Sequence, residues 1–462
     1  MMQHQDSRPR GLNETRVRAG SAAQARVFAT RSLLAALLCC RFAYSQTRES
    51  VPTNFKNDEA VERAKAGAMS EVNAAWWGFD PVDATRAIQA AIRTRAPKVI
   101  VPYVGKSWVV GPLTLVSNQE LIFEPGVVVM AKEGAFRGIR DCLISGDEVT
   151  NVTIRGYHAT LRMRKADYTR GDYATSEWRH VISLRGASDI RLLGLTLESS
   201  GGDGVYIGPT EDDRRIACRK VTIEDCVCKD NHRQGISVIS AEDLTIANCT
   251  FSGTKGTAPQ AGIDLEPSHP RDLMVNIEVR NCRALGNSGS GFMTNLERLT
   301  AQSTPVSIRI EDCLVRDSRQ PGLRALLATA DGPNGFVEFK NCVTESVEYS
   351  GVRCLWNTGS PIELRFVDCK WRDVARRASE APVDLELSGR ATGGSPGGIR
   401  FDNCYVYDDQ DRPPIKAVFA SETNAIERVS GTIFVMIGQP EQTSGNLSLG
   451  IPGLRVEPKT HK

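Results

Sequence analysis

A short pattern that recurs seven times constrains the fold more than any other feature of this sequence. Each copy reads apolar-x-apolar-x-(Asn/Asp)-Cys. The seven copies end at Cys226, Cys249, Cys282, Cys313, Cys342, Cys369 and Cys404. Successive copies are 23 to 35 residues apart. Self-similarity with this period is typical of a solenoid, in which each repeat is one structural unit stacked on its neighbours.

A second short segment follows most of these cysteines and begins with glycine. Its six copies begin at Gly204, Gly235, Gly262, Gly291, Gly322 and Gly351. Two earlier segments, at 151–156 and 189–194, resemble coils that lack the cysteine. Two or three short strands per coil, with Gly and Asn at the corners, predict an all-β, right-handed parallel β-helix. A β-propeller is the competing fold, but its blades of about 40 to 50 residues fit these intervals poorly.

The ends of such a solenoid need a cover. Residues 83–93 have the pattern of an amphipathic helix with Asp83 as its N-cap, and a strand follows at 98–101. We therefore predict a linker at 46–75 and a β-helix domain with its N-terminal capping helix at 76–415. C-terminal strands, including a strand-like run at 432–437, and a tail would occupy 416–462.

The N-terminal 45 residues differ from the rest of the chain. Residues 1–31 are polar and basic, and a short apolar run broken by Arg41 leads to Ala43-x-Ser45. This arrangement resembles a secretory signal peptide, which predicts a secreted or periplasmic protein. A disordered N-terminal extension is the alternative. No uninterrupted apolar run reaches the roughly 18 residues of a membrane span.

The 13 cysteines would suggest disulfides in an exported protein. Their recurrence at one place in each coil instead favours an inward ladder of small apolar side chains. Cys226 and Cys228 lack the second half of a zinc site, so we expect neither a metal nor another cofactor. The net charge of +2, from 57 basic and 55 acidic residues, does not favour a nucleic-acid partner. We expect a monomer.

Stacking the glycine-led strands in register gathers polar side chains on one outward face. The first outward position is occupied by Tyr206, Ser237, Asp264, Met293, Arg324 and Arg353. The next is occupied by Gly208, Ile239, Glu266, Asn295, Leu326 and Leu355. Of these six copies, only the third places acids at both positions. Asp264 and Glu266 would lie roughly 6–7 Å apart on the surface, a separation suited to acid/base chemistry on a sugar.

Neighbouring positions complete the candidate site. The candidate catalytic residues are Asp264, Glu266 and Asp203. The candidate substrate-binding residues are His232, Arg233, Tyr206, Arg324 and Arg353. Each has a structural alternative, such as a solvated strand face or a turn. Aromatic and basic residues in the connection 164–180 could form a wall beside this face.

Two motifs resemble a known group of proteins. The segment from Gly78 to Ile92 is similar to the capping helix of polygalacturonase-type glycoside hydrolases. Ser200-Gly-Gly-Asp203-Gly204 looks like the place where those hydrolases carry Asn-Thr-Asp-Gly. Over roughly 76–415 the sequence thus resembles the pectate lyase-like superfamily of parallel β-helix proteins. Asp203 is the only residue whose role the motif carries over from those hydrolases. The segment Asn231-His-Arg-Gln-Gly also looks like the residues that lead into strands in alginate epimerases.

The resemblance and the carboxylate pair predict an exported carbohydrate-active enzyme, with a polysaccharide or oligosaccharide as its partner. Glycoside hydrolysis in a groove on the β-helix face is the leading hypothesis. A polysaccharide lyase or uronate epimerase is the second. A non-catalytic, glycan-binding surface β-helix is the third. The sequence leaves the sugar, the linkage and the stereochemical outcome open.

Overall fold

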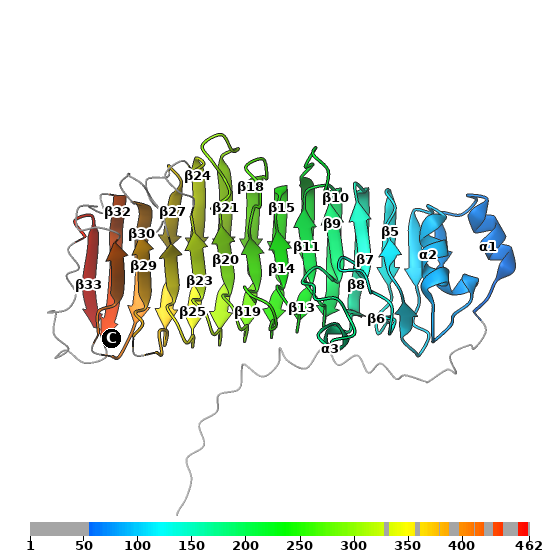
Figure 1. Ribbon diagram of the computed structural model, residues 1–462, viewed down its shortest axis with the longest axis horizontal. Helices are drawn as coiled ribbons and strands as arrows, with labels where there is room; N and C mark the ends of the chain where they lie inside the picture. Colours follow the sequence, from blue (N-terminus) through cyan, green and yellow to red (C-terminus); the bar gives the residue numbers. More distant parts are fainter. Residues whose placement is uncertain are drawn as a thin grey trace, which may run out of the picture. The chain divides into compact units, whose positions relative to one another are not determined.

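Parallel strands stack in chain order along nearly all of the chain that can be described (Figure 1). The computed structural model describes residues 55–327, 332–355, 361–377, 379–387, 397–410, 412–419, 428–437 and 451–460. The strands form one sheet of 22 strands and one of 11, and the pairings between named strands are parallel. The expected all-β parallel solenoid is confirmed.

The eleven-stranded sheet takes one strand from each coil. Its members are β4 (Leu113–Thr114), β7 (Ile144–Asp147), β9 (Ile182–Arg185), β11 (Val205–Gly208), β14 (Ile236–Val238), β17 (Ile263–Leu265), β20 (Phe292–Asn295), β23 (Leu323–Leu326), β26 (Val352–Leu355), β29 (Val383–Leu387) and β31 (Ile415–Phe419). The glycine-led segments of the sequence are six of these strands, from β11 to β26.

The twenty-two-stranded sheet takes the other strands of each coil. It comprises β1 (Glu71–Asn73), β2 (Lys98–Val101), β3 (Trp108–Val110), β5 (Gln119–Phe123), β6 (Val128–Ala131), β8 (Thr150–Arg162), β10 (Ser188–Glu198), β12 (Cys218–Glu224), β13 (Val227–Lys229), β15 (Ala241–Ala247), β16 (Thr250–Ser252), β18 (Met274–Arg280), β19 (Arg283–Leu285), β21 (Val306–Glu311), β22 (Leu314–Arg316), β24 (Gly335–Lys340), β25 (Val343–Glu345), β27 (Glu363–Val367), β28 (Lys370–Arg372), β30 (Gly397–Tyr407), β32 (Arg428–Ile437) and β33 (Leu454–Thr460). Strands three apart in the chain pair with each other, as β12 does with β15, so a coil contains three strands.

In six of the seven copies, the Asn or Asp of the repeated pattern makes the corner between two of these strands, and in the seventh Asn403 lies at an irregularity within β30. All seven such residues have positive φ, between 49° and 57°. Asn and Asp tolerate this left-handed conformation better than other residues that carry a Cβ. Their side chains also bond between coils: Asn248 Nδ2 donates to Asp225 Oδ1 (3.2 Å), and Asn281 Nδ2 donates to Asn248 Oδ1 (2.8 Å). The repeat therefore encodes the turn itself.

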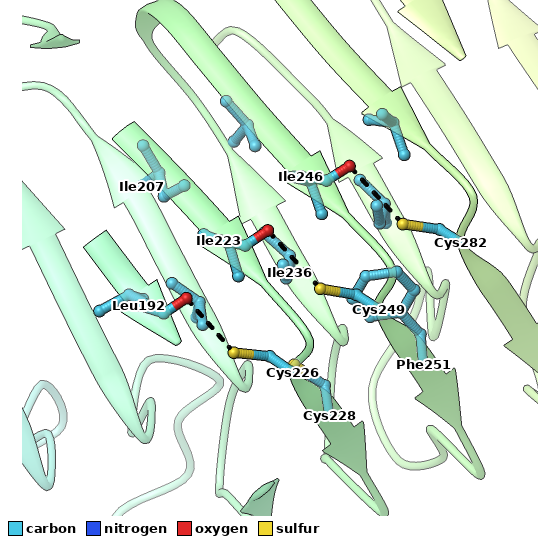
Figure 2. Close-up of a cluster of buried hydrophobic side chains, with 14 of the residues drawn as sticks. Leu192, Ile207, Ile223, Cys226, Cys228, Ile236, Ile246, Cys249, Phe251 and Cys282 are labelled. Carbon is cyan, nitrogen blue, oxygen red and sulfur yellow. Dashed lines mark hydrogen bonds between the residues drawn. The ribbon is translucent and has the colours of Figure 1, made fainter. Parts of the chain in front are cut away.

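The cysteine after each corner points into the core (Figure 2). The seven repeat cysteines are at most 2% exposed. The thiols of Cys226, Cys249 and Cys282 each donate to a carbonyl of the preceding coil, at 3.6 to 3.7 Å. All 11 cysteines in the described part of the chain are free thiols, as the ladder interpretation predicts. Cys39 and Cys40 lie outside that part.

Stacked apolar side chains fill the interior between the sheets. One row is Val221, Leu244, Ile277, Ile308, Val337, Leu364 and Ile399, all at most 1% exposed. Burying one such side chain contributes about 1.5–3 kcal/mol to folding. Further along, Phe339, Phe366 and Phe401 stack with ring centroids 5.3 and 5.1 Å apart. The interior is thus mainly apolar, although a few polar side chains are buried in it, such as Thr344 between Val315 and Trp371.

The N-terminal cap contains α1 (Asp58–Lys65), η1 (Ala74–Trp77) and α2 (Thr85–Arg93), while α3 (Lys165–Tyr168) lies in a later connection. The apolar face of α2 is buried, as expected for a capping helix. The helix begins at Thr85, and its N-cap is Ala84 and not Asp83 as predicted. Asp83 lies one residue earlier, where it pairs with Lys132 (2.7 Å) and accepts from the Thr85 N–H (3.0 Å). No described helix is long and apolar enough to cross a membrane.

Both ends of the solenoid extend past the boundaries expected from the sequence. β1 pairs with β2, so the cap reaches into the range 46–75 that was assigned to a linker. β32 and β33 continue the larger sheet beyond residue 415, and β32 contains the strand-like run at 432–437. Residues 1–45 lie outside the described part.

The left-handed backbone at Asn248 should contribute more to stability than the hydrogen bonds of its side chain. We expect Asn248→Ala to lower the free energy of unfolding by about 2 kcal/mol, because alanine is disfavoured at positive φ and cannot replace the side-chain bonds. Asn248→Gly loses the same bonds but adopts the corner freely, so it should destabilise less. Thermal unfolding of the three proteins measures this. A glycine variant as unstable as the alanine variant would contradict the prediction.

Candidate functional site

The outward positions of the eleven-stranded sheet stack as the sequence predicts. Cα pairing runs from Tyr206 to Ser237, to Asp264, to Met293, to Arg324 and to Arg353. The structure adds Ser183 of β9 before this row and Asp384 of β29 after it. The inferred register is therefore correct over all six coils.

A pocket of about 370 Å³ lies over β11, β14, β17 and β20, and we call it the Glu266 pocket. Three of the eight candidate residues line it: Tyr206, Arg233 and Glu266. Trp178 and Glu297 also line it, from connections outside the strands. Trp178 belongs to the connection 164–180, which therefore forms part of a wall as expected.

Asp264 lies at the centre of β17 beneath this pocket. Its side chain is fully buried, so the prediction that it lies at the surface beside Glu266 is wrong. Coils are only about 4.8 Å apart, so longer side chains of the neighbouring coils close over the short aspartate. Gln234 Nε2 of the preceding coil donates to Asp264 Oδ2 at 2.9 Å. Glu266 remains partly open, with 29% of its side chain exposed.

Burial raises the pKa of Asp264 well above its usual value, and the nearby Glu266 carboxylate raises it further. The Arg233 guanidinium acts in the opposite direction, and Asp203 adds a smaller upward effect. Asp264 therefore holds a proton under conditions that ionise an ordinary aspartate.

Arg233 connects the acidic groups of the site. Its Nη2 donates to Glu266 Oε2 at 2.9 Å, and its Nη1 donates to Ser237 Oγ at 3.1 Å. The guanidinium also lies 3.9 Å from Asp203 Oδ2 and 3.7 Å from Glu177 Oε2. One cation thus lies within 4 Å of three carboxylates. Such a group fixes their positions as well as offsetting their charge.

Asp203 lies behind the pocket wall. It is fully buried, and its main-chain N–H donates to His180 Nδ1 at 3.0 Å. The His180 ring, itself 1% exposed, stacks on Tyr206 with centroids 4.9 Å apart. Tyr206 is the member of this group that reaches the pocket. Asp203 can therefore influence the pocket through His180 and Arg233 rather than by touching a ligand there.

Three candidates lie away from the Glu266 pocket. His232 Nε2 bonds Thr257 Oγ1 at 3.0 Å, and burial and Lys165 lower the pKa of His232. Arg353 pairs with Glu386 of the next coil. Arg324 lies two coils beyond Asp264, where burial and the neighbouring Arg353 lower its pKa.

Other polar residues at the site were not identified from the sequence. Glu177, Arg185, Glu297 and Arg298 approach or line the pockets of this face. Arg185 occupies the same position in β9 as Gly208 does in β11, but β9 follows Val181 rather than a glycine. The others come from connections without a repeat pattern. In the described part of the chain, no group of three or more His, Cys, Asp or Glu could hold a metal ion.

Comparison with known proteins agrees with the fold. Residues 145–370 match a family described as a right handed beta helix region. The uncharacterized protein YclG of Bacillus subtilis is 25% identical over 257 residues, which cover 52% of this chain. The chain spans about 41% of the length of that curated relative. The expected right-handed parallel β-helix is confirmed.

Solved structures share the same architecture at low sequence identity. The A-module of the mannuronan C-5 epimerase AlgE6 of Azotobacter vinelandii has a TM-score of 0.60 at 16% identity, with 84% of this chain and 99% of that chain covered. The family 28 exopolygalacturonase of Yersinia enterocolitica has 0.54 at 12% identity, with 85% and 78% covered. The tailspike gp49 of Acinetobacter baumannii bacteriophage Fri1, a capsular polysaccharide depolymerase, has 0.51 at 14%, with 85% and 64% covered. The expected likeness to polygalacturonase-type proteins holds at the level of the fold.

The proton held by Asp264 should appear in the pH dependence of stability. Its pKa is higher in the folded protein than in the unfolded chain. Above about pH 4 the folded protein therefore holds more protons than the unfolded chain does. Stability should fall through that window, by up to about 1.4 kcal/mol per pH unit, until the folded-state pKa is passed. Asp264→Asn mimics the protonated acid and should lack this slope. Unfolding midpoints of both proteins at about pH 5 and pH 8 test it. Parallel profiles would contradict it.

Proposed function

We propose that this protein is an enzyme that acts on a polysaccharide, and that it hydrolyses a glycosidic bond in the Glu266 pocket. The observation that carries the proposal is the Asp264–Glu266 pair, in which a buried carboxyl with a raised pKa lies beside one that opens to the pocket. The β-helix neighbours named as a polygalacturonase and a capsular polysaccharide depolymerase support the substrate class.

Glycoside hydrolysis needs one carboxyl group that carries a proton near neutral pH. Asp264 retains that proton but cannot touch a ligand, because it is fully buried. Glu266 opens to the pocket and delivers a proton to the glycosidic oxygen as the bond from that oxygen to the sugar carbon breaks. Asp264 acts as a positioning residue beneath Glu266, where its protonated form adds no second negative charge.

The other half of the reaction is the attack of water on the sugar carbon. A carboxylate must take the proton of that water. Glu297 is the second acid among the described residues that line the pocket, and it follows β20 on the adjacent coil. We assign it this role in place of Asp203, which lies behind Arg233 and does not line the pocket.

The remaining pocket side chains suit a carbohydrate. Trp178 and Tyr206 present aromatic surface, while Arg233, Asn295 and Arg298 offer hydrogen-bond donors. Sugars bind to such a combination because their rings have apolar faces and polar edges. Export is part of the proposal and rests on the basic and apolar N-terminal sequence, which lies outside the described residues.

A lyase acting on uronates is the second candidate, and Arg324 is the observation that favours it. This guanidinium is half-buried, and burial and Arg353 lower its pKa. From the coil two beyond that of Asp264, this guanidinium could neutralise the carboxylate of a uronate. Elimination leaves unsaturated, ultraviolet-absorbing products, whereas hydrolysis does not.

Glu266→Gln tests the proposal directly. On a panel of polysaccharides, we expect the wild type to release reducing ends without ultraviolet absorbance, and the variant to be slower by about 10²- to 10⁴-fold. Glu278→Gln, on a half-buried position of β18 in the other sheet, is the matched control and should retain full activity.

Two outcomes would overturn the proposal. Full activity of Glu266→Gln, with an unchanged unfolding midpoint, would remove Glu266 from the reaction. Binding of a glycan by the wild type with no turnover across the panel would identify the protein as a glycan-binding β-helix.

A further inference from the structure

A second pocket lies beside the Glu266 pocket on the same sheet. It has a volume of about 420 Å³ and lies over β7 and β9, and we call it the β9 pocket. Arg140, Arg185 and Glu211 line it. Both pockets therefore lie over consecutive strands of the eleven-stranded sheet, where a long ligand would have to pass from one to the other.

A row of five touching side chains separates the two pockets. Arg140 lies over the Trp178 ring at 5.1 Å and forms an ion pair with Glu211. Arg185 Nη1 lies 3.3 Å from Glu211 Oε1, and the Arg185 guanidinium lies 4.4 Å from the Tyr206 ring centroid. Trp178 and Tyr206 line the Glu266 pocket, while the three charged residues line the β9 pocket. The row is thus a partition with one pocket on each side.

This partition crosses the width of the sheet. Arg140 precedes β7 and Trp178 precedes β9, whereas Glu211 follows β11. In a parallel, in-register sheet, residues that precede strands lie along one edge and residues that follow them lie along the other. A four-residue strand is about 13 Å long. The Arg140–Glu211 pair therefore joins the two edges above β9.

The Arg140 edge of the partition is held in place by its neighbours. Cys142 Sγ donates to the Trp178 carbonyl at 3.6 Å, and Ser176 Oγ donates to the Ile139 carbonyl. Arg137 Nη1 donates to the Asp172 carbonyl at 2.9 Å. The segments that carry Arg140 and Trp178 are thus tied to each other.

We infer that the row Trp178–Arg140–Glu211–Arg185–Tyr206 closes the Glu266 pocket at one end, so that the enzyme binds a polysaccharide by a chain terminus and releases short products. The inference rests on the proposed function. A chain that continued into the β9 pocket would have to break the Arg140–Glu211 pair and part Arg140 from Trp178. A chain that ends at the partition leaves both contacts intact.

The test compares product lengths from the wild type and from a variant carrying Arg140→Ala and Glu211→Ala. The probe is whichever of polygalacturonate, alginate and a bacterial capsular polysaccharide the wild type degrades. We expect the wild type to release one dominant short product from the earliest times, while viscosity falls slowly for each reducing end formed. The double variant should shift to a spread of lengths with a faster fall in viscosity.

Arg214→Ala is the matched control, because Arg214 lines the β9 pocket but pairs with Glu148 and Asp212 outside the row. Its product lengths should equal those of the wild type. Glu211→Gln removes one charge at nearly constant shape and should give the same shift if the double variant unfolds.

Each outcome bears on a separate claim. A spread of lengths from the wild type, or unchanged products from folded variants of the row, would overturn this inference and leave the proposed hydrolysis standing. No new reducing ends from any of the three probes would overturn the proposed function and the inference together.

Discussion

Parallel, in-register pairing between successive coils is the constraint on which the rest of the structure depends. Each strand bonds to the strand one coil before it and one coil after it, so every outward residue has fixed neighbours in sequence segments about 30 residues away. The corners make this possible, because Asn and Asp adopt the left-handed backbone that turns the chain at the same place in each coil. A change in register of one residue would move Asp264 from the outer face to the core.

The electrostatics of the site follow from that pairing. It brings Asp203 from the coil before Arg233, and Asp264 and Glu266 from the coil after it, around this single cation. Burial disfavours charge, and one guanidinium offsets only part of the repulsion among the acids. The site relieves this by leaving a proton on Asp264, the most deeply buried acid that lies next to Glu266. The raised pKa of Asp264 thus arises from the same close stacking that stabilises the solenoid.

The residues at the sides of the site come from the connections between strands, whereas those beneath it come from the strands themselves. Floor residues such as Asp264 lie at repeated strand positions, so the glycine that leads each strand predicts their neighbours. Trp178, Glu211 and Glu297 lie in connections whose lengths and sequences do not repeat. These connections turn an otherwise uniform sheet into separate pockets, and the partition beside Tyr206 is built largely from them. Specificity in such a solenoid is therefore set by the least regular parts of the chain.

The coil, the register and the stacking of the outward residues can be predicted from the sequence, because they depend on local patterns: a left-handed Asn or Asp, an inward cysteine and a leading glycine. Only the tertiary structure decided which of those residues a ligand can reach. Asp203 and Asp264 share a face with Glu266, yet both are buried. Gln234 of the preceding coil bonds Asp264, and His180 and Arg233 lie against Asp203. Burial depends on residues distant in the sequence, so no pattern within one coil reports it.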